Sequence, residues 1–241
     1  WQLKHDKRVN EAFKTAKLLI SSIPDSYRAI KRYKGLESVI IPETGCFLSE
    51  DIPTERFEEE YLHVMWVGKF DFRKQLPLAL WTIATVANPH VILDVYGSGS
   101  DEQMHHAKYL ASELGIEDMV VWHGNQSNDV VLEAMRKSQL FIFTSVSEDT
   151  STVVLEAISN RLPVVCFDAC GMAAVIDNKV GRKISLSKPM QSVHDFAKIL
   201  KDLEKNRDVL KQMSENCKQR QMELSWEEKA KTMVEWYEKL L

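Results

Sequence analysis

The chain has 241 residues, of which 44% are hydrophobic and 27% are charged, and its formal net charge is −4 at pH 7. This apolar fraction is enough to form a buried core at this length. The slightly acidic balance lacks the basic excess of a nucleic-acid-binding protein, and no DNA- or RNA-binding motif is present, so nucleic acid is excluded as a partner. No apolar run reaches the roughly 18 residues that a membrane-spanning helix needs.

The cysteines are scattered and form no CxxC pair with metal-ligand spacing. We therefore expect reduced thiols in a cytoplasmic protein, and no metal centre. The four are Cys46, Cys166, Cys170 and Cys217. The chain begins with Trp1 rather than Met, which is typical of a fragment.

Residues 1–49 are predicted to be part of an amino-terminal domain. Their pattern indicates a helix to about residue 14, a strand at 17–21, a helix at 25–33 and a strand at 38–41, a unit too small to stand alone. Residues 50–60 carry six acidic residues and one basic residue, so we place an acidic linker at 50–61. The basic side chains of the second helix favour a solvated face, with contact to an anionic membrane surface as the alternative.

From residue 62 onward, short β-rich runs alternate with helical patterns. This alternation predicts an α/β fold, a doubly wound and mostly parallel sheet over residues 62–241. The strands are expected at 63–67, 91–96, 119–122, 140–143, 163–167 and 182–184. The helices between them are expected at 76–87, 101–114, 129–138, 152–160 and 172–178, and three more follow residue 187.

The loop after the first strand of this sheet carries three cations. Gly68 permits a tight turn, and Lys69, Arg73 and Lys74 follow it. Open α/β sheets bind ligands beyond the carboxyl ends of their strands, and cations there form charge-assisted hydrogen bonds to phosphate oxygens. The loop is therefore a candidate phosphate site, with a solvated basic turn as the alternative.

The second strand ends in Gly97-Ser98-Gly99, which invites comparison with a dinucleotide-binding fingerprint. The third glycine of G-x-G-x-x-G is replaced by Glu102, so a dehydrogenase is disfavoured. We expect Gly97 and Gly99 to let the backbone approach a base, a ribose or the neighbouring strand. Gly124 follows the third strand in a similar way, and Asn125 offers a polar contact to a base edge. His123 is interpreted as a structural histidine.

Two carboxylates, Glu148 and Glu156, stand eight residues apart after the fourth strand. A helix that starts near Thr150 or Ser151 places both around its amino-terminal end, where unpaired N–H groups attract anions. Glu156 lies on an otherwise apolar helical face and needs a hydrogen-bonding partner or a ligand. Polyol-binding carboxylates beside an anion site predict a nucleotide-sugar ligand, although surface acids that favour the helix dipole are the alternative. Both acids approach from one side, unlike a glycosidase pair.

These motifs, in this order, resemble the retaining glycosyltransferases of family 4, which have the two-domain GT-B fold. The resemblance covers residues 62–241, the carboxy-terminal donor-binding domain, and residues 1–49, with the stretch 41–45 near their end, look like the tail of the family's amino-terminal domain. It implies transfer of a sugar from a nucleoside-diphosphate donor to an acceptor hydroxyl, with retention and without a required metal or cofactor. The acceptor would be a sugar or a lipid-linked glycan, as in polysaccharide biosynthesis at a membrane surface.

The resemblance also implies roles for single residues. Lys74 and Lys69 would neutralise the leaving diphosphate, Glu148 would hold donor-sugar hydroxyls and Glu156 the ribose. The amides of the loop and first helical turn would cradle the phosphate and sugar; these belong to Thr150, Ser151, Thr152 and Val153. The family usually has Arg at position 69, and it often has a Gly-Phe-Gly-like stretch where this chain has 149–152, so sugar specificity does not carry over.

The expected truncation leaves donor binding in place and most of the acceptor side missing, so the isolated chain is expected to be inactive. The last helix, 226–241, would cross onto the amino-terminal domain, and its apolar face is otherwise exposed or pairs with a second copy in a homodimer. The alternatives are a sugar-nucleotide epimerase of the same architecture and a non-catalytic nucleotide-sugar-binding or assembly module.

Overall fold

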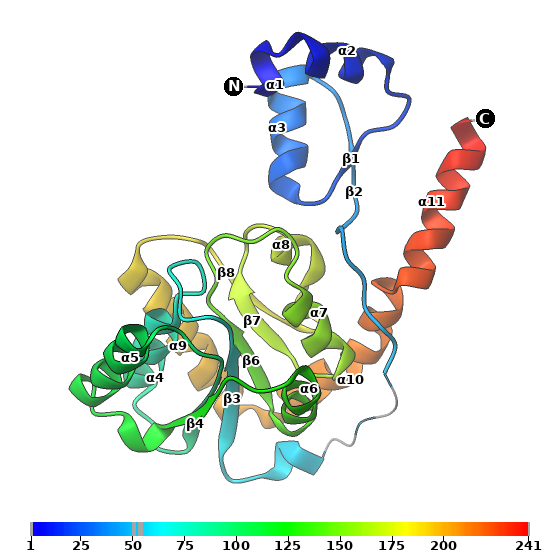
Figure 1. Ribbon diagram of the computed structural model, residues 1–241. Coiled ribbons are helices and arrows are strands. Elements are labelled where there is room, and N and C mark those ends of the chain that lie inside the picture. The colour runs from blue at the N-terminus through cyan, green and yellow to red at the C-terminus, as the bar shows by residue number, and fades with distance from the viewer. Residues whose placement is uncertain (1, 50–51, 53–54, 241) are drawn as a thin grey trace.

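A six-stranded parallel sheet forms the centre of the molecule, as the computed structural model shows for residues 2–49, 52 and 55–240 (Figure 1). The strand order is β5-β4-β3-β6-β7-β8, and every neighbouring pair is parallel. The doubly wound α/β fold expected from the sequence is therefore confirmed. The strands are β3 (Leu62–Val67), β4 (Val91–Tyr96), β5 (Val120–Gly124), β6 (Leu140–Phe143), β7 (Val164–Phe167) and β8 (Gly181–Ile184).

Helices cover both faces of the sheet, which explains why the central strands are apolar without interruption. In β6, Leu140 and Ile142 join the core cluster under α4, α5 and α9, whereas Phe141 and Phe143 join the cluster under α6, α7 and α8. All four are buried. The helices of this domain are α4 (Leu76–Val86), α5 (Asp101–Glu113), α6 (Asn128–Lys137), α7 (Thr152–Ser159), α8 (Met172–Val175), α9 (Pro189–Lys205), α10 (Arg207–Glu223) and α11 (Trp226–Leu240).

Most expected boundaries agree with the structure within two residues, and the differences have local causes. The helix expected at 172–178 ends at Val175, because Asp177 starts a turn in which its side chain accepts from the Lys179 amide. The first helix is divided into α1 (Gln2–His5) and α2 (Lys7–Thr15), because the Asp6 carboxylate caps the second of these.

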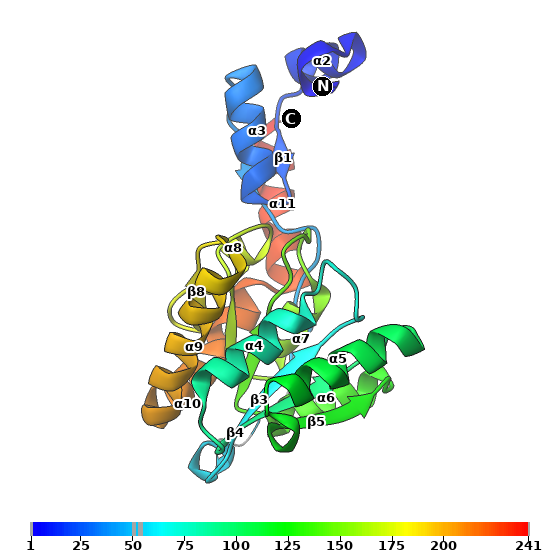
Figure 2. The same ribbon diagram turned by 90° about the vertical axis from the view of Figure 1, so that its left-hand side faces the viewer.

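The amino-terminal segment lies apart from the sheet, on the side towards which the strands point (Figures 1 and 2). Its strands β1 (Ile20–Ser21) and β2 (Val39–Ile40) are parallel but shorter than the expected runs, and α3 (Pro24–Lys34) connects them. Only Ile30 of α3 is buried. Helix α11 runs beside this segment, and Lys17 Nζ donates to the carbonyl of Leu240 at 3.0 Å.

The described part of the acidic linker is anchored to the sheet domain. The 3₁₀ helix η1 (Glu55–Glu58) buries Phe57 in the core and leaves Arg56 only 7% exposed. The Arg56 guanidinium donates to the carbonyls of Arg136 and Arg161, each at 2.8 Å. Burial lowers the pKa of Arg56 to about 10, so it remains charged at neutral pH. Residues 50, 51, 53 and 54 of the expected linker lie outside the described residues.

Replacing Arg56 with alanine is expected to lower the free energy of unfolding by about 2–4 kcal/mol, because two carbonyls lose their charged donor. Urea denaturation measures the change. Arg28→Ala is the matched control, since Arg28 forms an exposed pair with Asp25 that contributes at most about 1 kcal/mol. Equal effects of the two substitutions would contradict the anchoring role of Arg56.

Candidate functional site

The candidate site lies where the loops after β3, β4 and β6 meet. Helix α4 follows β3 on one face of the sheet and α7 follows the adjacent β6 on the other, which makes this edge the topological switch point where open α/β sheets bind ligands. Backbone hydrogen bonds join the loops: Phe70 N–H donates to Ser98 O at 3.0 Å, and Val146 N–H donates to Arg73 O at 2.9 Å. The sequence-predicted loops therefore come together at one place.

Glycines allow two of these loops to touch. Gly97 has a φ of 133°, and a Cβ atom there would lie 1.8 Å from the carbonyl oxygen of Gly68. No side chain fits at position 97. At Gly99 a Cβ atom would lie 2.5 Å from Gln103 Oε1, which caps the amino end of α5. Gly124 has a φ of 70°, and its carbonyl accepts from the Gly97 amide.

Lys74 and Glu148 form the central contact of the site. Lys74 Nζ lies 2.6 Å from Glu148 Oε1, and the two side chains are only 17% and 14% exposed. Ser145 Oγ donates to the same carboxylate oxygen at 3.0 Å. The structure thus brings together the cation and the carboxylate that the sequence singled out in separate loops.

A chain of hydrogen bonds from the core fixes the backbone of Lys74. Trp66 Nε1 donates to Thr144 Oγ1 at 3.0 Å, and Thr144 Oγ1 contacts the Lys74 carbonyl at 2.7 Å. Asp71 accepts from the amides of Arg73 and Lys74. Burial opposes ionisation of Asp71, but these two amides outweigh it and lower the pKa of the carboxyl overall. The loop is therefore held in one shape from both sides.

The other cations of the loop are placed differently. Arg73 is exposed and pairs with Asp71, with 3.4 Å between NH2 and Oδ2. Lys69 is exposed, and its side chain has no hydrogen bond or ion pair with any residue in the described ranges. Lys69 is therefore available to an anionic ligand, whereas Arg73 must first leave its partner.

The amino end of α7 presents backbone donors. The helix starts at Thr152, the first residue of the range expected for it, and the side chain of its N-cap residue Ser151 forms no capping hydrogen bond. Among the described residues, the amides of Ser151, Thr152 and Val153 have no acceptor. The Thr150 amide is different, because it donates to Glu43 Oε1 at 2.6 Å.

Glu43 is a site residue that sequence reasoning missed. It belongs to the segment before the sheet domain, 107 residues from its partner, and no local pattern marks it. The only signal was its place in Ile41-Pro42-Glu43-Thr44-Gly45, the stretch near the end of the segment that resembles the tail of the family's amino-terminal domain. The loop that receives it is tightly packed: a Cβ atom at Gly171 would lie 2.4 Å from Thr150 Oγ1, a buried hydroxyl without a hydrogen-bond partner among the described residues.

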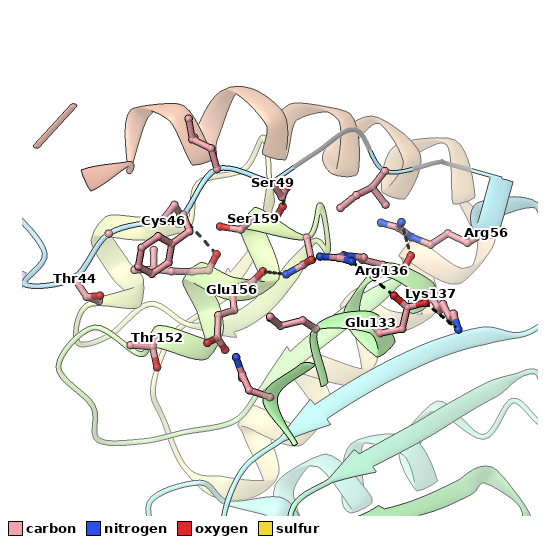
Figure 3. Close-up of a pocket in the computed structure, with 18 of the residues that line it drawn as sticks. Thr44, Cys46, Ser49, Arg56, Glu133, Arg136, Lys137, Thr152, Glu156 and Ser159 are labelled. Carbon is pink, nitrogen blue, oxygen red and sulfur yellow. Dashed lines mark hydrogen bonds and ion pairs between the residues drawn. The ribbon is translucent and has the colours of Figure 1, made fainter. Parts of the chain in front are cut away.

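Glu156 lies in the second turn of α7, as expected, and lines a cavity of about 960 Å³ between α6, α7 and the segment at 44–49 (Figure 3). Thr152 and Asn128 line the same cavity, whereas Lys74 and Glu148 do not. Burial raises the pKa of the Glu156 carboxyl. The two carboxylates of the motif therefore occupy separate environments, one paired with a cation and one desolvated.

His123 has the structural partner that the sequence did not reveal. Asp94, which is 8% exposed, contacts His123 Nε2 and His63 Nδ1, each at 2.7 Å. The hydrogen bond that Asp94 accepts from the His63 ring raises the pKa of His63, although burial opposes it. Tyr96 stacks on His123 with 4.1 Å between ring centroids. Asn125, on the loop beyond, is exposed.

The described residues also bear on metal binding, cysteine chemistry and membrane-spanning helices. They contain no group of three or more His, Cys, Asp or Glu side chains placed to hold a metal ion. All four cysteines are free, and burial raises the pKa of Cys166 to about 12. In the same ranges no helix has the length and apolar character required to cross a membrane.

Comparison with known proteins connects this geometry to a family. The model of the family "Glycosyl transferases group 1" matches residues 49–220. The D-inositol 3-phosphate glycosyltransferase of Streptomyces coelicolor is 26% identical over 129 residues, which cover 53% of this chain and 27% of that protein.

Solved structures share the fold at low sequence identity. The pneumococcal O-GlcNAc transferase GtfA, solved with UDP and GlcNAc, has a TM-score of 0.72 at 19% identity, covering 95% of this chain and 47% of its own. Sucrose-phosphate synthase of Thermosynechococcus elongatus has a TM-score of 0.73 at 19% identity, covering 99% and 63%. Anabaena Alr3699/HepE, solved with UDP and glucose, has a TM-score of 0.67 at 18% identity, covering 95% and 66%.

The chain spans about a quarter of the curated relative and about half of GtfA. The family match nevertheless covers most of the chain and includes every loop of the candidate site. This chain therefore belongs to the group 1 glycosyl transferases, and its parallel sheet is the Rossmann-like domain of a GT-B glycosyltransferase.

Proposed function

We propose that this chain binds the nucleoside-diphosphate-sugar donor of a retaining glycosyltransferase of family 4. The observation that carries the proposal is the mostly buried pair of Lys74 and Glu148 at the topological switch point. A buried ion pair contributes little to stability after its desolvation cost, so its place at a ligand-binding edge favours a functional role.

Lys74 is assigned to the leaving diphosphate. Negative charge develops on the phosphate oxygen as the bond to the sugar breaks, and a fixed ammonium group at that point lowers the barrier. Thr144 contacts the Lys74 carbonyl and Asp71 accepts from the Lys74 amide, and these bonds hold the Lys74 backbone in place before the donor arrives. Lys69 supplies a second cation from the same loop.

Glu148 is assigned to the donor sugar. Its contacts with Lys74 and Ser145 both involve Oε1, which leaves Oε2 to accept hydrogen bonds from sugar hydroxyls. The amides of Ser151, Thr152 and Val153 extend the site from the sugar towards the phosphates, where the helix dipole favours negative charge.

Glu156 is assigned to the ribose, since a desolvated carboxylate in an open cavity can accept from two vicinal hydroxyls. Gly124 and Asn125, after β5, are assigned to the base. GtfA and HepE were solved with UDP, so uridine is the first base to test.

The proposed retention of configuration is expected to follow a front-face displacement. The acceptor hydroxyl forms the new glycosidic bond on the face from which the diphosphate departs, and a donor phosphate oxygen takes its proton. No protein base is assigned. The acceptor, a sugar or lipid-linked glycan, would bind mainly to the part of such enzymes that lies outside this chain, so donor binding is the activity expected here.

UDP is expected to raise the melting temperature of the chain, because a ligand of the folded state stabilises it. Lys74→Ala is expected to weaken UDP binding about 10- to 100-fold, since one charge-assisted hydrogen bond is lost. Isothermal titration calorimetry measures both proteins, with exposed Lys108→Ala as the control. The double variant K74A/E148Q avoids an unpaired Glu148, and unchanged affinity in it would refute the assignment.

Glu156→Gln is expected to weaken UDP binding and to raise the melting temperature at pH 7. The raised pKa means that the folded state prefers the neutral acid. This preference stabilises the fold below the ordinary pKa, and the stabilisation is lost as pH rises through the folded-state pKa. Glutamine removes the cost of the buried charge at pH 7, so its advantage should disappear near pH 4.

Thermal unfolding at the two pH values tests this trade-off, with exposed Glu113→Gln as the control. A variant that loses stability at pH 7 while keeping its UDP affinity would show that Glu156 is a structural acid.

A further inference from the structure

Glu43 places a negative charge on the loop that is assigned to the donor. Its Oε1 accepts from the Thr150 amide at 2.6 Å, beside Glu148 in sequence and directly before the uncapped end of α7. The side chain comes from outside the sheet domain and is exposed, whereas Thr150 is 8% exposed. The contact therefore joins a long, exposed glutamate side chain to a buried residue of the loop.

Helix α11 sets the position of Glu43. Lys229 Nζ donates to the carbonyl of Pro42 at 2.8 Å and also to that of Thr44, so one ammonium group holds the residues on both sides of Glu43. Lys229 is buried, and this burial lowers its pKa. The next residues are held as well, because the Cys46 amide donates to Leu224 O at 2.9 Å.

The backbone at Gly45 packs closely against the start of α11. A Cβ atom at Gly45 would lie 3.1 Å from the ring of Trp226, the first residue of α11. The segment at 42–46 is thus fixed to the junction of α10 and α11, and the Glu43 side chain reaches across to the loop before α7.

The electrostatics of the α7 end make Glu43 a competitor for the donor. The helix dipole and the N–H groups of residues 150–153 favour one anion at this end. A nucleoside diphosphate brings further negative charge to the same amides. Its phosphates and the Glu43 carboxylate then repel each other, because the site is partly desolvated.

We propose that Glu43 is a displaceable carboxylate of the donor site, which binds the Thr150 amide until a nucleotide-sugar takes that place. This inference rests on the donor-binding function proposed above. Displacement frees Glu43 from the loop while Lys229 keeps its backbone on α11, so donor occupancy is coupled to the segment at 42–46 and to the helix that runs beside the amino-terminal segment. Because binding linkage is reciprocal, the factor by which the donor weakens the contact between Glu43 and Thr150 is also the factor by which this contact weakens donor binding.

The opposite role is a permanent brace, in which Glu43 keeps the loop in its binding shape. Displacement predicts that removing the charge tightens nucleotide binding, whereas the brace role predicts equal or weaker binding, so affinity separates them. Glu43→Gln is the informative substitution, because the amide oxygen still accepts from Thr150 while the negative charge is gone.

Isothermal titration calorimetry of the whole chain with UDP, GDP and ADP tests the proposal. For the nucleotide that binds, Glu43→Gln is expected to tighten binding about three- to tenfold, and the exposed control Glu11→Gln is expected to leave it unchanged. Equal or weaker binding by Glu43→Gln would overturn the displaceable-carboxylate role while leaving the donor site intact. If no nucleotide binds to the wild type or to any variant, the donor-binding function fails, and this inference fails with it.

A spectroscopic readout follows the contact itself. The side-chain carboxyl ¹³C signal of Glu43 is expected to move towards that of a free carboxylate when the tightest-binding nucleotide is added, because its short bond to the Thr150 amide is lost. The corresponding signal of the exposed Glu11 is expected to stay in place. A Glu43 signal that stays in place at saturation would show that Glu43 remains bound and would refute displacement.

Discussion

The contact between Lys74 and Glu148 is the constraint on which the candidate site depends. It joins the loop after β3 to the loop after β6, and both partners are largely withdrawn from water. Such a pair demands fixed geometry, which the bonds from Trp66 to Thr144 and from Thr144 to the Lys74 backbone provide. The large buried core thus determines where one ammonium group and one carboxylate meet.

The sheet topology explains why these loops meet at all. β3 is the first strand of the domain and lies beside β6, so the chain turns to opposite faces after these two neighbours. The absence of a side chain at Gly97 then allows the loop after β4 to close against Gly68. Backbone donors, cations and acids are collected at one edge, while Glu156 stands apart in a cavity that the preceding segment helps to form.

The sequence predicted the sheet domain well because its signals are local: apolar runs such as Leu140–Phe143 and turns rich in glycine recur at regular intervals. The same logic places the loops of Lys74 and Glu148 at one edge, since parallel strands end there, but the ion pair between the two side chains was not predicted. Contacts between distant segments were not predictable. Glu43 reaches Thr150 over 107 residues, and Arg56 reaches Arg161 over 105. Asp94 lies within the apolar run that predicts β4, and nothing in that run indicates that its side chain contacts His123, so this partner was missed.

Hydrogen exchange followed by mass spectrometry tests the central claim that the loops of β3 and β6 form one donor site. With saturating UDP, peptides covering residues 68–75 and 144–153 are expected to gain protection together, while peptides covering α9 remain unchanged. Protection confined to other peptides, or to only one of the two loops, would contradict the account.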